Sequence, residues 1–128
     1  MTPAVSAVLF AKDSRRLSRF YVDVFGARTL AEDEHHAALD VRGFRLIVHQ
    51  IPPHFAKDVE IRNPPSRRES GAIRLDYPVD DLVKARNAAR QLDGQIDEMP
   101  PAWAGKESRF FLGFDPEGNV FGVSAAGR

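Results

Sequence analysis

The sequence predicts an α+β fold built from two tandem βαβββ units, because one pattern occurs twice along the chain. Residues 13–26, DSRRLSRFYVDVFG, begin with an acidic residue and end with a glycine. Residues 81–94, DLVKARNAARQLDG, do the same over the same length. Each stretch follows a short apolar segment and precedes strand-like segments that close in a glycine-containing turn. Two copies of one strand–helix–strand–strand–strand unit explain this repetition.

The first copy predicts an amphipathic helix that begins at Asp13 and ends at Gly26. Asp13 and Ser14 are typical N-terminal caps, since their side chains accept hydrogen bonds from free backbone N–H groups. Apolar residues recur at intervals of three and four, which places them on one helix face: Leu17, Phe20, Tyr21, Val24 and Phe25. Gly26 supplies the left-handed conformation with which many helices end.

Strands are predicted around this helix to complete unit one, residues 4–51. Four segments have strand-like composition: 4–11, 27–34, 36–41 and 44–51. The continuous apolar character of the first indicates a strand covered on both faces. Arg42 and Gly43 join the last two strands as a compact hairpin turn.

Residues 52–71 are predicted to link the two units. Two Pro-Pro pairs in this segment oppose regular structure, and HFAKDVEI between them is compatible with one or two helical turns. The linker is longer than most connections in compact domains, which makes it a candidate lid.

Unit two is predicted to span residues 72–126 with the same order of elements. Its expected elements are a strand 72–78, the helix 81–94, a strand 95–98, a loop 99–106 and a hairpin of strands 109–115 and 119–125. The hairpin turns at Asp115-Pro116-Glu117-Gly118, where Pro sets φ and Gly tolerates a positive φ.

Composition narrows the class of protein. The 128 residues suit a single domain made of the two units, and 18 basic residues balance 18 acidic ones. This neutral balance does not favour a nucleic-acid or membrane partner. The chain has no cysteine, which excludes disulfides, thiolate metal ligands and a cysteine nucleophile. The first apolar run, 4–11, has no positive charge before it and stops at Lys12-Asp13, which makes it a poor signal peptide, and it is far too short to span a membrane. A cytoplasmic location is therefore expected.

Two motifs, in this order and with the repeat, resemble those of the vicinal oxygen chelate superfamily. They are Asp13…Ser18-Arg19-Phe20-Tyr21…Gly26 and Asp115-Pro116-Glu117-Gly118-Asn119. That superfamily includes glyoxalase I, extradiol dioxygenases, and bleomycin- and fosfomycin-resistance proteins. The resemblance implies that the sheets of the two units curl into a cup with the helices outside. It also implies a divalent metal in the cup, held by His or Glu on the first and last strands of each unit, and a homodimer.

The residues at the implied metal positions are unsuited to a metal. The positions on the first strands are Ser6 and Arg74, and those on the last strands are Ile47 and Gly122. Hard and borderline divalent metal ions prefer imidazole or carboxylate ligands. His49 follows Ile47 by two residues on the same face, but one histidine does not replace three ligands. We therefore expect neither a metal nor another cofactor.

Four residues offer chemistry in place of a metal. Arg74 and Asp76 share a strand face, where the guanidinium suits a carboxylate or phosphate; alternatively, the two side chains pair with each other. His49 is a candidate general base or hydrogen-bond donor, or a structural residue near a strand end. Trp103, in the loop that lengthens unit two, is either a platform for a ligand or a filler of a core gap.

The other three histidines are weaker candidates for a functional role. His35 and His36 are adjacent, so on a strand their side chains point to opposite faces and are poor co-ligands. We expect both to be exposed to solvent. His54 lies in the linker.

The predicted function is metal-independent binding of a small organic molecule in a largely apolar cup, with an arginine for an anionic group. The predicted ligand-binding residues are Ser6, Val8, His49, Arg74, Asp76, Trp103 and Gly122. The alternative is a lyase, isomerase or dioxygenase of the same superfamily with a non-standard or metal-free site, for which His49 and Asp76 are the catalytic candidates. A third possibility is a degenerate member retained for a structural or regulatory partner.

Overall fold

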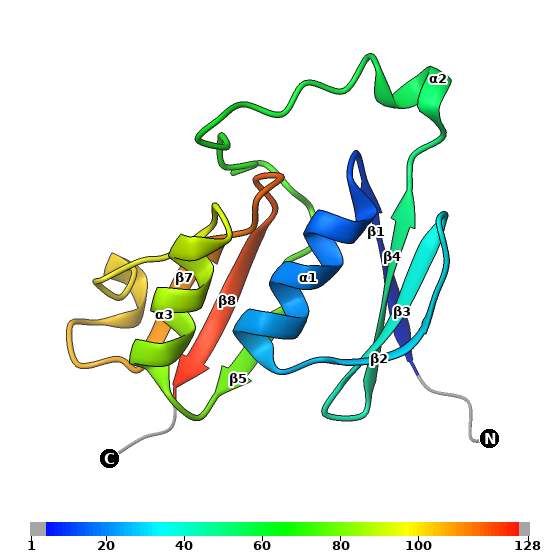
Figure 1. Cartoon of the computed structure of the whole chain (residues 1–128). Coiled ribbons are helices and arrows are strands. Elements are labelled where there is room, and N and C mark those ends of the chain that lie inside the picture. The colour runs from blue at the N-terminus through cyan, green and yellow to red at the C-terminus, as the bar shows by residue number, and fades with distance from the viewer. Residues whose placement is uncertain (1–4, 126–128) are drawn as a thin grey trace. The chain divides into compact units, whose positions relative to one another are not determined.

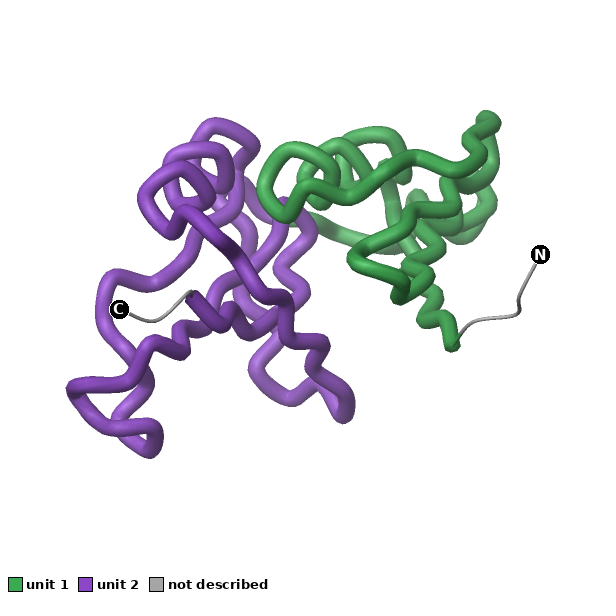
Figure 2. Tube along the Cα trace, turned by 90° about the horizontal axis from the view of Figure 1, so that it is seen from below, with its two compact units in different colours: residues 1–61 green, residues 62–128 purple. Residues whose placement is uncertain are grey.

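The computed structural model describes residues 5–125, so Ala4 and Ala126, the predicted outer limits of the two units, lie outside the described residues. The chain divides into unit 1, residues 1–61, and unit 2, residues 62–128 (Figure 2). This division falls inside the predicted linker. Each unit holds a four-stranded mixed sheet and one long helix, which confirms the predicted α+β fold of tandem βαβββ units.

Unit 1 contains the predicted elements in the predicted order (Figure 1). Its elements are β1 (Ser6–Ala11), α1 (Ser14–Phe25), β2 (Arg28–Glu32), β3 (His36–Val41), β4 (Phe44–Gln50) and the short α2 (Pro53–Ala56). The strands are ordered β1-β4-β3-β2, with β1 parallel to β4 and the other neighbours antiparallel. The helix α2 lies in the segment expected to make one or two helical turns.

The helix α1 forms for the reasons that its sequence suggests. The Asp13 carboxylate accepts a hydrogen bond from the Arg16 N–H at 3.1 Å, which satisfies one free donor of the first turn. Gly26 ends the helix with φ at 71°. The predicted apolar face of α1 is buried, and the helix contacts β1, β3 and β4, in which Leu39, Leu46 and Val48 are fully buried.

The hairpin of β3 and β4 has a two-residue turn. Arg42 and Gly43 both adopt positive φ, at 52° and 91°, as the favoured hairpin turns require. The turn sets the register, which runs from Val41 opposite Phe44 to His36 opposite His49.

Unit 2 repeats this topology. Its elements are β5 (Asp76–Val79), α3 (Leu82–Gln91), β6 (Gln95–Ile96), the 3₁₀ helix η1 (Ala102–Ala104), β7 (Phe110–Phe114) and β8 (Val120–Ala125). The strands are ordered β5-β8-β7-β6, with β5 parallel to β8. The Asp81 carboxylate caps α3 by accepting from the Lys84 N–H at 3.0 Å.

Three boundaries in unit 2 differ from those predicted. The strand predicted over 72–78 begins only at Asp76, so Arg74 lies before β5. The strand predicted over 95–98 ends at Ile96; the Asp97 N–H still donates to the Leu112 carbonyl of β7 at 2.8 Å, while the Asp97 carbonyl accepts from Arg86 Nη2 at 2.6 Å. The helix predicted to end at Gly94 ends at Gln91, and Asp93 rather than Gly94 takes the left-handed conformation, with φ at 66°.

Within residues 5–125, no helix has the length and apolar character needed to cross a membrane.

Candidate ligand-binding site

The sheet of unit 1 has one face that α1 does not cover, which we call the open face of unit 1. Leu46 and Val48 of β4 are fully buried under the helix, whereas Ile47 is partly buried and His49 is exposed. Because side chains alternate along a strand, Ile47 and His49 point to the open face. The predicted residues Ser6 and Val8 lie on the same face. Unit 1 therefore groups three predicted site residues, namely Ser6, Val8 and His49.

The open face of unit 2 carries the other predicted site residues. Tyr77 and Val123 are buried toward the core, so Asp76 and Gly122, which alternate with them, lie on the open face. The register of β5 and β8 places Asp76 directly beside Gly122.

Arg74, Asp76, Trp103, Phe110 and Gly122 form one cluster, which we call the Arg74 cluster. Arg74 donates from Nε to Asp76 Oδ1 at 2.7 Å and from Nη2 to Asp76 Oδ2 at 3.1 Å. The guanidinium carbon of Arg74 lies 5.0 Å from the ring centroid of Phe110 and 5.7 Å from that of Trp103. The two ring centroids are 5.6 Å apart. The guanidinium is thus held between a carboxylate and two aromatic rings, within cation–π range of both.

Gly122 leaves the space that this cluster occupies. A Cβ atom at residue 122 would lie 2.2 Å from Asp76 Oδ1 and 2.5 Å from Phe110 Cζ. Any larger residue would therefore push the carboxylate and the ring away from the sheet. The missing side chain lets both groups lie flat on β8.

The electrostatics of the cluster keep Arg74 charged. The hydrogen bonds that Arg74 donates to the Asp76 carboxylate raise the pKa of the Arg74 guanidinium. The ion pair is only partly exposed, with side-chain exposures of 38% for Arg74 and 41% for Asp76. On the core side of β5, next to Asp76, burial raises the pKa of the Tyr77 hydroxyl, so that this group stays protonated.

The structure decides between two pairs of alternatives left open by the sequence. Arg74 and Asp76 do pair with each other, so the guanidinium is not free of a carboxylate partner. Trp103 does not fill a core gap, since it is 67% exposed on the loop around η1. The two catalytic candidates, Asp76 and His49, lie in different units. His49 is occupied by a hydrogen bond between its Nδ1 and the Gln50 carbonyl at 3.0 Å.

Phe110 belongs to the Arg74 cluster, although the sequence did not single it out. Strand alternation contains the signal, because Phe110 shares a face with Leu112, which lies opposite Gly122. The two-residue hairpin turn likewise puts His36 opposite His49.

The metal positions implied by the superfamily do not fit a metal. Ser6 and Ile47 offer a hydroxyl and an alkyl group, and Arg74 is itself a cation. No carboxylate fits at Gly122 unless Asp76 and Phe110 move. Among residues 5–125, no group of three or more His, Cys, Asp or Glu side chains is placed to hold one ion.

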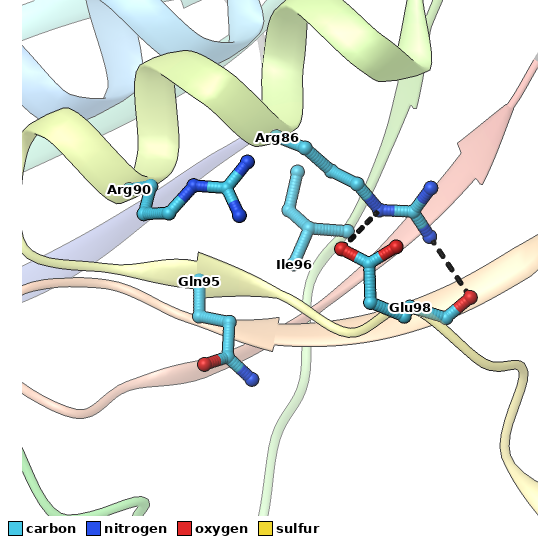
Figure 3. A pocket seen from close by; sticks show the side chains of 5 residues that line it. All are labelled: Arg86, Arg90, Gln95, Ile96 and Glu98. Carbon is cyan, nitrogen blue, oxygen red and sulfur yellow. Dashed lines mark hydrogen bonds and ion pairs between the residues drawn. The ribbon is translucent and has the colours of Figure 1, made fainter.

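A separate cavity of about 210 Å³ lies between α3 and β6. Its lining residues are Arg86, Arg90, Gln95, Ile96 and Glu98 (Figure 3). The Glu98 carboxylate lies 4.0 Å from Arg86 Nε, and Arg86 also donates to the Glu98 carbonyl at 3.4 Å. The guanidinium of Arg86 therefore mainly ties α3 to the chain after β6.

Known structures resemble the whole chain. FosX from Listeria monocytogenes, complexed with Mn(II) and sulfate, is 13% identical with a TM-score of 0.67, over 98% of this chain and 90% of that one. FosX from Mesorhizobium loti is 12% identical with a TM-score of 0.65, over 98% and 92%. A glyoxalase/bleomycin resistance protein/dioxygenase family enzyme from Burkholderia phytofirmans is 18% identical with a TM-score of 0.63, over 94% and 95%. At these identities the likeness is one of fold.

No curated protein sequence matches the chain. The model of a family described as a glyoxalase-like domain matches residues 6–124, from the first residue of β1 to the last but one of β8. With its tandem βαβββ units, the chain therefore belongs to the glyoxalase-like domain family, within the vicinal oxygen chelate superfamily.

Proposed function

We propose that the protein binds a small organic molecule at the Arg74 cluster, without a metal at the positions implied by the superfamily. The ligand stacks an aromatic or flat apolar group on Trp103 and Phe110 and places an anionic or strongly polar group at the Arg74 guanidinium. The observation that carries the proposal is the exposed Trp103 ring beside a guanidinium fixed by Asp76.

The exposure of Trp103 supports a binding role for the cluster. A tryptophan that is 67% exposed contributes little to the core, and large apolar groups open to solvent often mark binding surfaces. Trp103 does not stand alone, because Phe110 and Arg74 lie within 6 Å of its ring. An aromatic ligand would gain contact area from both rings and attraction from the cation.

Asp76 has two opposing effects on such a ligand. Its two hydrogen bonds fix the guanidinium in place, which lowers the entropy lost on binding. Its negative charge also offsets the charge that an anionic ligand would seek. An anionic group would therefore bind the N–H groups of Arg74 that Asp76 leaves over, namely those of Nη1 and the second N–H of Nη2.

The single tryptophan makes this proposal directly measurable, because fluorescence excited selectively at tryptophan, and not at the two tyrosines, reports Trp103 alone. A panel of aromatic carboxylates and their neutral amides is titrated in the presence of a chelator, with fluorescence and melting temperature as readouts. We expect a subset of the carboxylates to change the fluorescence and raise the melting temperature, because they bind the folded state only. The chelator should have no effect on these affinities.

Variants assign the contacts. Arg74→Ala should weaken a bound carboxylate at least about tenfold and its neutral amide less, as the loss of a charge-assisted hydrogen bond predicts. Trp103→Ala should weaken the binding of both the carboxylate and the amide, with the melting temperature as the readout because this variant has no tryptophan. Arg62→Ala removes an exposed arginine elsewhere in unit 2 and serves as the control. Binding that requires a divalent ion, or that survives both cluster variants, contradicts the proposal.

The assembly that we propose, on the superfamily resemblance, is a homodimer. Sedimentation equilibrium of the untagged chain measures the mass directly, and a species of 14.3 kDa at every concentration contradicts a dimer.

A further inference from the structure

We propose that His36 and His49 form a two-histidine site for a borderline divalent transition-metal ion such as Zn²⁺, Ni²⁺ or Cu²⁺, with Asp33 as a positioning residue. The site lies on the open face of unit 1. It shares no residue with the Arg74 cluster and none with the positions at which the superfamily resemblance implies a metal.

The sheet register brings the two histidines together. His36 of β3 lies directly opposite His49 of β4 in the antiparallel pair. The Gln50 N–H donates to the His35 carbonyl at 2.7 Å, so the hydrogen-bonded pair is the adjacent one. Such pairs alternate along an antiparallel ladder, which makes His36 and His49 a non-hydrogen-bonded pair. In pairs of that kind the two side chains are closest.

The imidazole rings are close to the separation that chelation needs. Their centroids are 6.5 Å apart and their planes are inclined by 26°. Metal–nitrogen distances of about 2.0–2.1 Å bring the centroids of two chelating imidazoles to roughly 5–6 Å. The observed separation exceeds this range by less than 2 Å, so the proposal requires the two side chains to rotate until both Nε2 atoms face one ion.

The hydrogen bonds of both rings set the tautomer that binds a metal. His49 Nδ1 lies 3.0 Å from the Gln50 carbonyl oxygen, and His36 Nδ1 lies 3.1 Å from Asp33 Oδ1. A carbonyl and a carboxylate only accept hydrogen bonds, so both neutral rings carry their proton on Nδ1. Each Nε2 then has a free lone pair. Metal-binding histidines almost always have this outer partner on the second nitrogen.

Asp33 is itself held in place for this task. Its Oδ1 accepts hydrogen bonds from the backbone N–H groups of His35 at 2.8 Å and His36 at 2.9 Å. These two bonds hold the Asp33 carboxylate beside the His36 ring. A carboxylate in this position orients the His36 ring.

The surroundings leave the pair accessible. The His36 side chain is 40% exposed, so an ion reaches it without a change of fold. Phe10 of β1 flanks His49 on the other side, with ring centroids 5.8 Å apart, and provides an apolar border. Two protein nitrogens leave the remaining coordination positions to water or to donor atoms of a bound molecule.

The test uses the untagged full chain and the metal alone. Isothermal titration calorimetry with Ni²⁺ and with Zn²⁺ measures affinity, and electron paramagnetic resonance of the Cu²⁺ form reports nitrogen ligands. We expect one ion per chain and two coordinated imidazole nitrogens. His36→Ala and His49→Ala should each weaken binding at least about tenfold, and the double variant little more, because either single change already destroys the chelate.

The chain supplies matched controls. His35→Ala and His54→Ala remove the other two histidines and should leave the affinity unchanged. Asp33→Asn keeps an oxygen acceptor for the two backbone N–H groups, so it should change the melting temperature only slightly while weakening the metal about tenfold. No binding at 1 mM metal ion, where folding is intact by circular dichroism, overturns the proposal. Equal losses in the paired and the control histidine variants overturn it as well.

Discussion

The two units have the same topology but fill their cores from different elements. In unit 1 the helix supplies the bulk, with Phe20, Tyr21 and Phe25 all buried. In unit 2 the helix buries only Ala85 and Ala89. The large side chains there come from the strands instead: Tyr77, Phe111 and Phe121. A core must be filled to a constant density, but either side of the helix–sheet interface can supply the volume.

The open faces of the two units also differ. Unit 1 leaves Val8 and Phe10 45% and 63% exposed beside the histidine pair. Unit 2 covers its sheet with the Arg74 cluster, for which the longer connection between β6 and β7 supplies Trp103. The repeat therefore determines topology, whereas a few positions outside it determine which chemistry each face can perform.

The largest expected effect tests whether the helix fills the core in unit 1 but not in unit 2. Phe20 is fully buried, and its counterpart in the repeat is Ala88. Phe20→Ala should lower the free energy of unfolding by about 3–5 kcal/mol through lost burial and a new cavity. Ala88→Gly should cost only about 1 kcal/mol, the difference in helix propensity. Urea unfolding followed by circular dichroism measures both, and similar losses would mean that the units do not differ as described.

The second effect compares the two hairpin turns. Asp115 is fully buried and accepts hydrogen bonds from the backbone N–H groups of Glu117 at 2.9 Å and Asn119 at 3.0 Å. Asp115→Ala should cost about 2–4 kcal/mol, because buried donors lose their partner. Asp40 accepts from the Gly43 N–H at 3.2 Å in a more exposed turn, so Asp40→Ala should cost under about 1 kcal/mol. The same unfolding experiment ranks them, and the reverse order contradicts the prediction.

The third effect tests how closely Asp76 and Phe110 pack against Gly122 on the open face of unit 2. Unit 1 has Ile47 at the position of Gly122 in the repeat, so only unit 2 needs a residue without a side chain there. Gly122→Ala should cost about 1–3 kcal/mol, because its Cβ would displace the Asp76 carboxylate and the Phe110 ring. The penalty should shrink in an Asp76→Ala background, and a shift in Trp103 fluorescence should accompany it. An unchanged penalty would place the strain elsewhere.

The smallest effect concerns the open face of unit 1 and its dependence on pH. Backbone hydrogen bonds lower the pKa of Asp33 below its ordinary value of 3.8, so the folded state favours the ionised form. This stabilisation is present in full above the unfolded pKa and is lost as the pH falls through the folded pKa. Asp33→Asn should therefore lower the melting temperature slightly at pH 7. The difference from wild type should vanish in acid, and a difference that grows below pH 3.8 would contradict the shift.

Local signals in the sequence were sufficient for most of the fold. The Asp13 cap, the apolar face that begins at Leu17 and the Gly26 terminus all act within a few residues, so α1 has nearly its predicted bounds. The Arg42-Gly43 turn is equally local, and with it the register of β3 and β4. The boundaries predicted in unit 2 were less accurate. The Asp97 carbonyl after β6 accepts from Arg86 of α3, a contact that nothing near Asp97 in the sequence indicates.

The candidate sites likewise depend partly on local sequence and partly on tertiary packing. The sequence by itself determined the family, the tandem βαβββ topology and the lack of suitable metal ligands at the implied positions, because each depends on residue type and spacing. Only the tertiary structure decided that Arg74 pairs with Asp76 under the rings of Trp103 and Phe110, and that His36 and His49 lie side by side. Contacts between side chains from separate elements depend on register, rotamer and the space left by a residue such as Gly122. Those quantities are set by packing, which no local pattern contains.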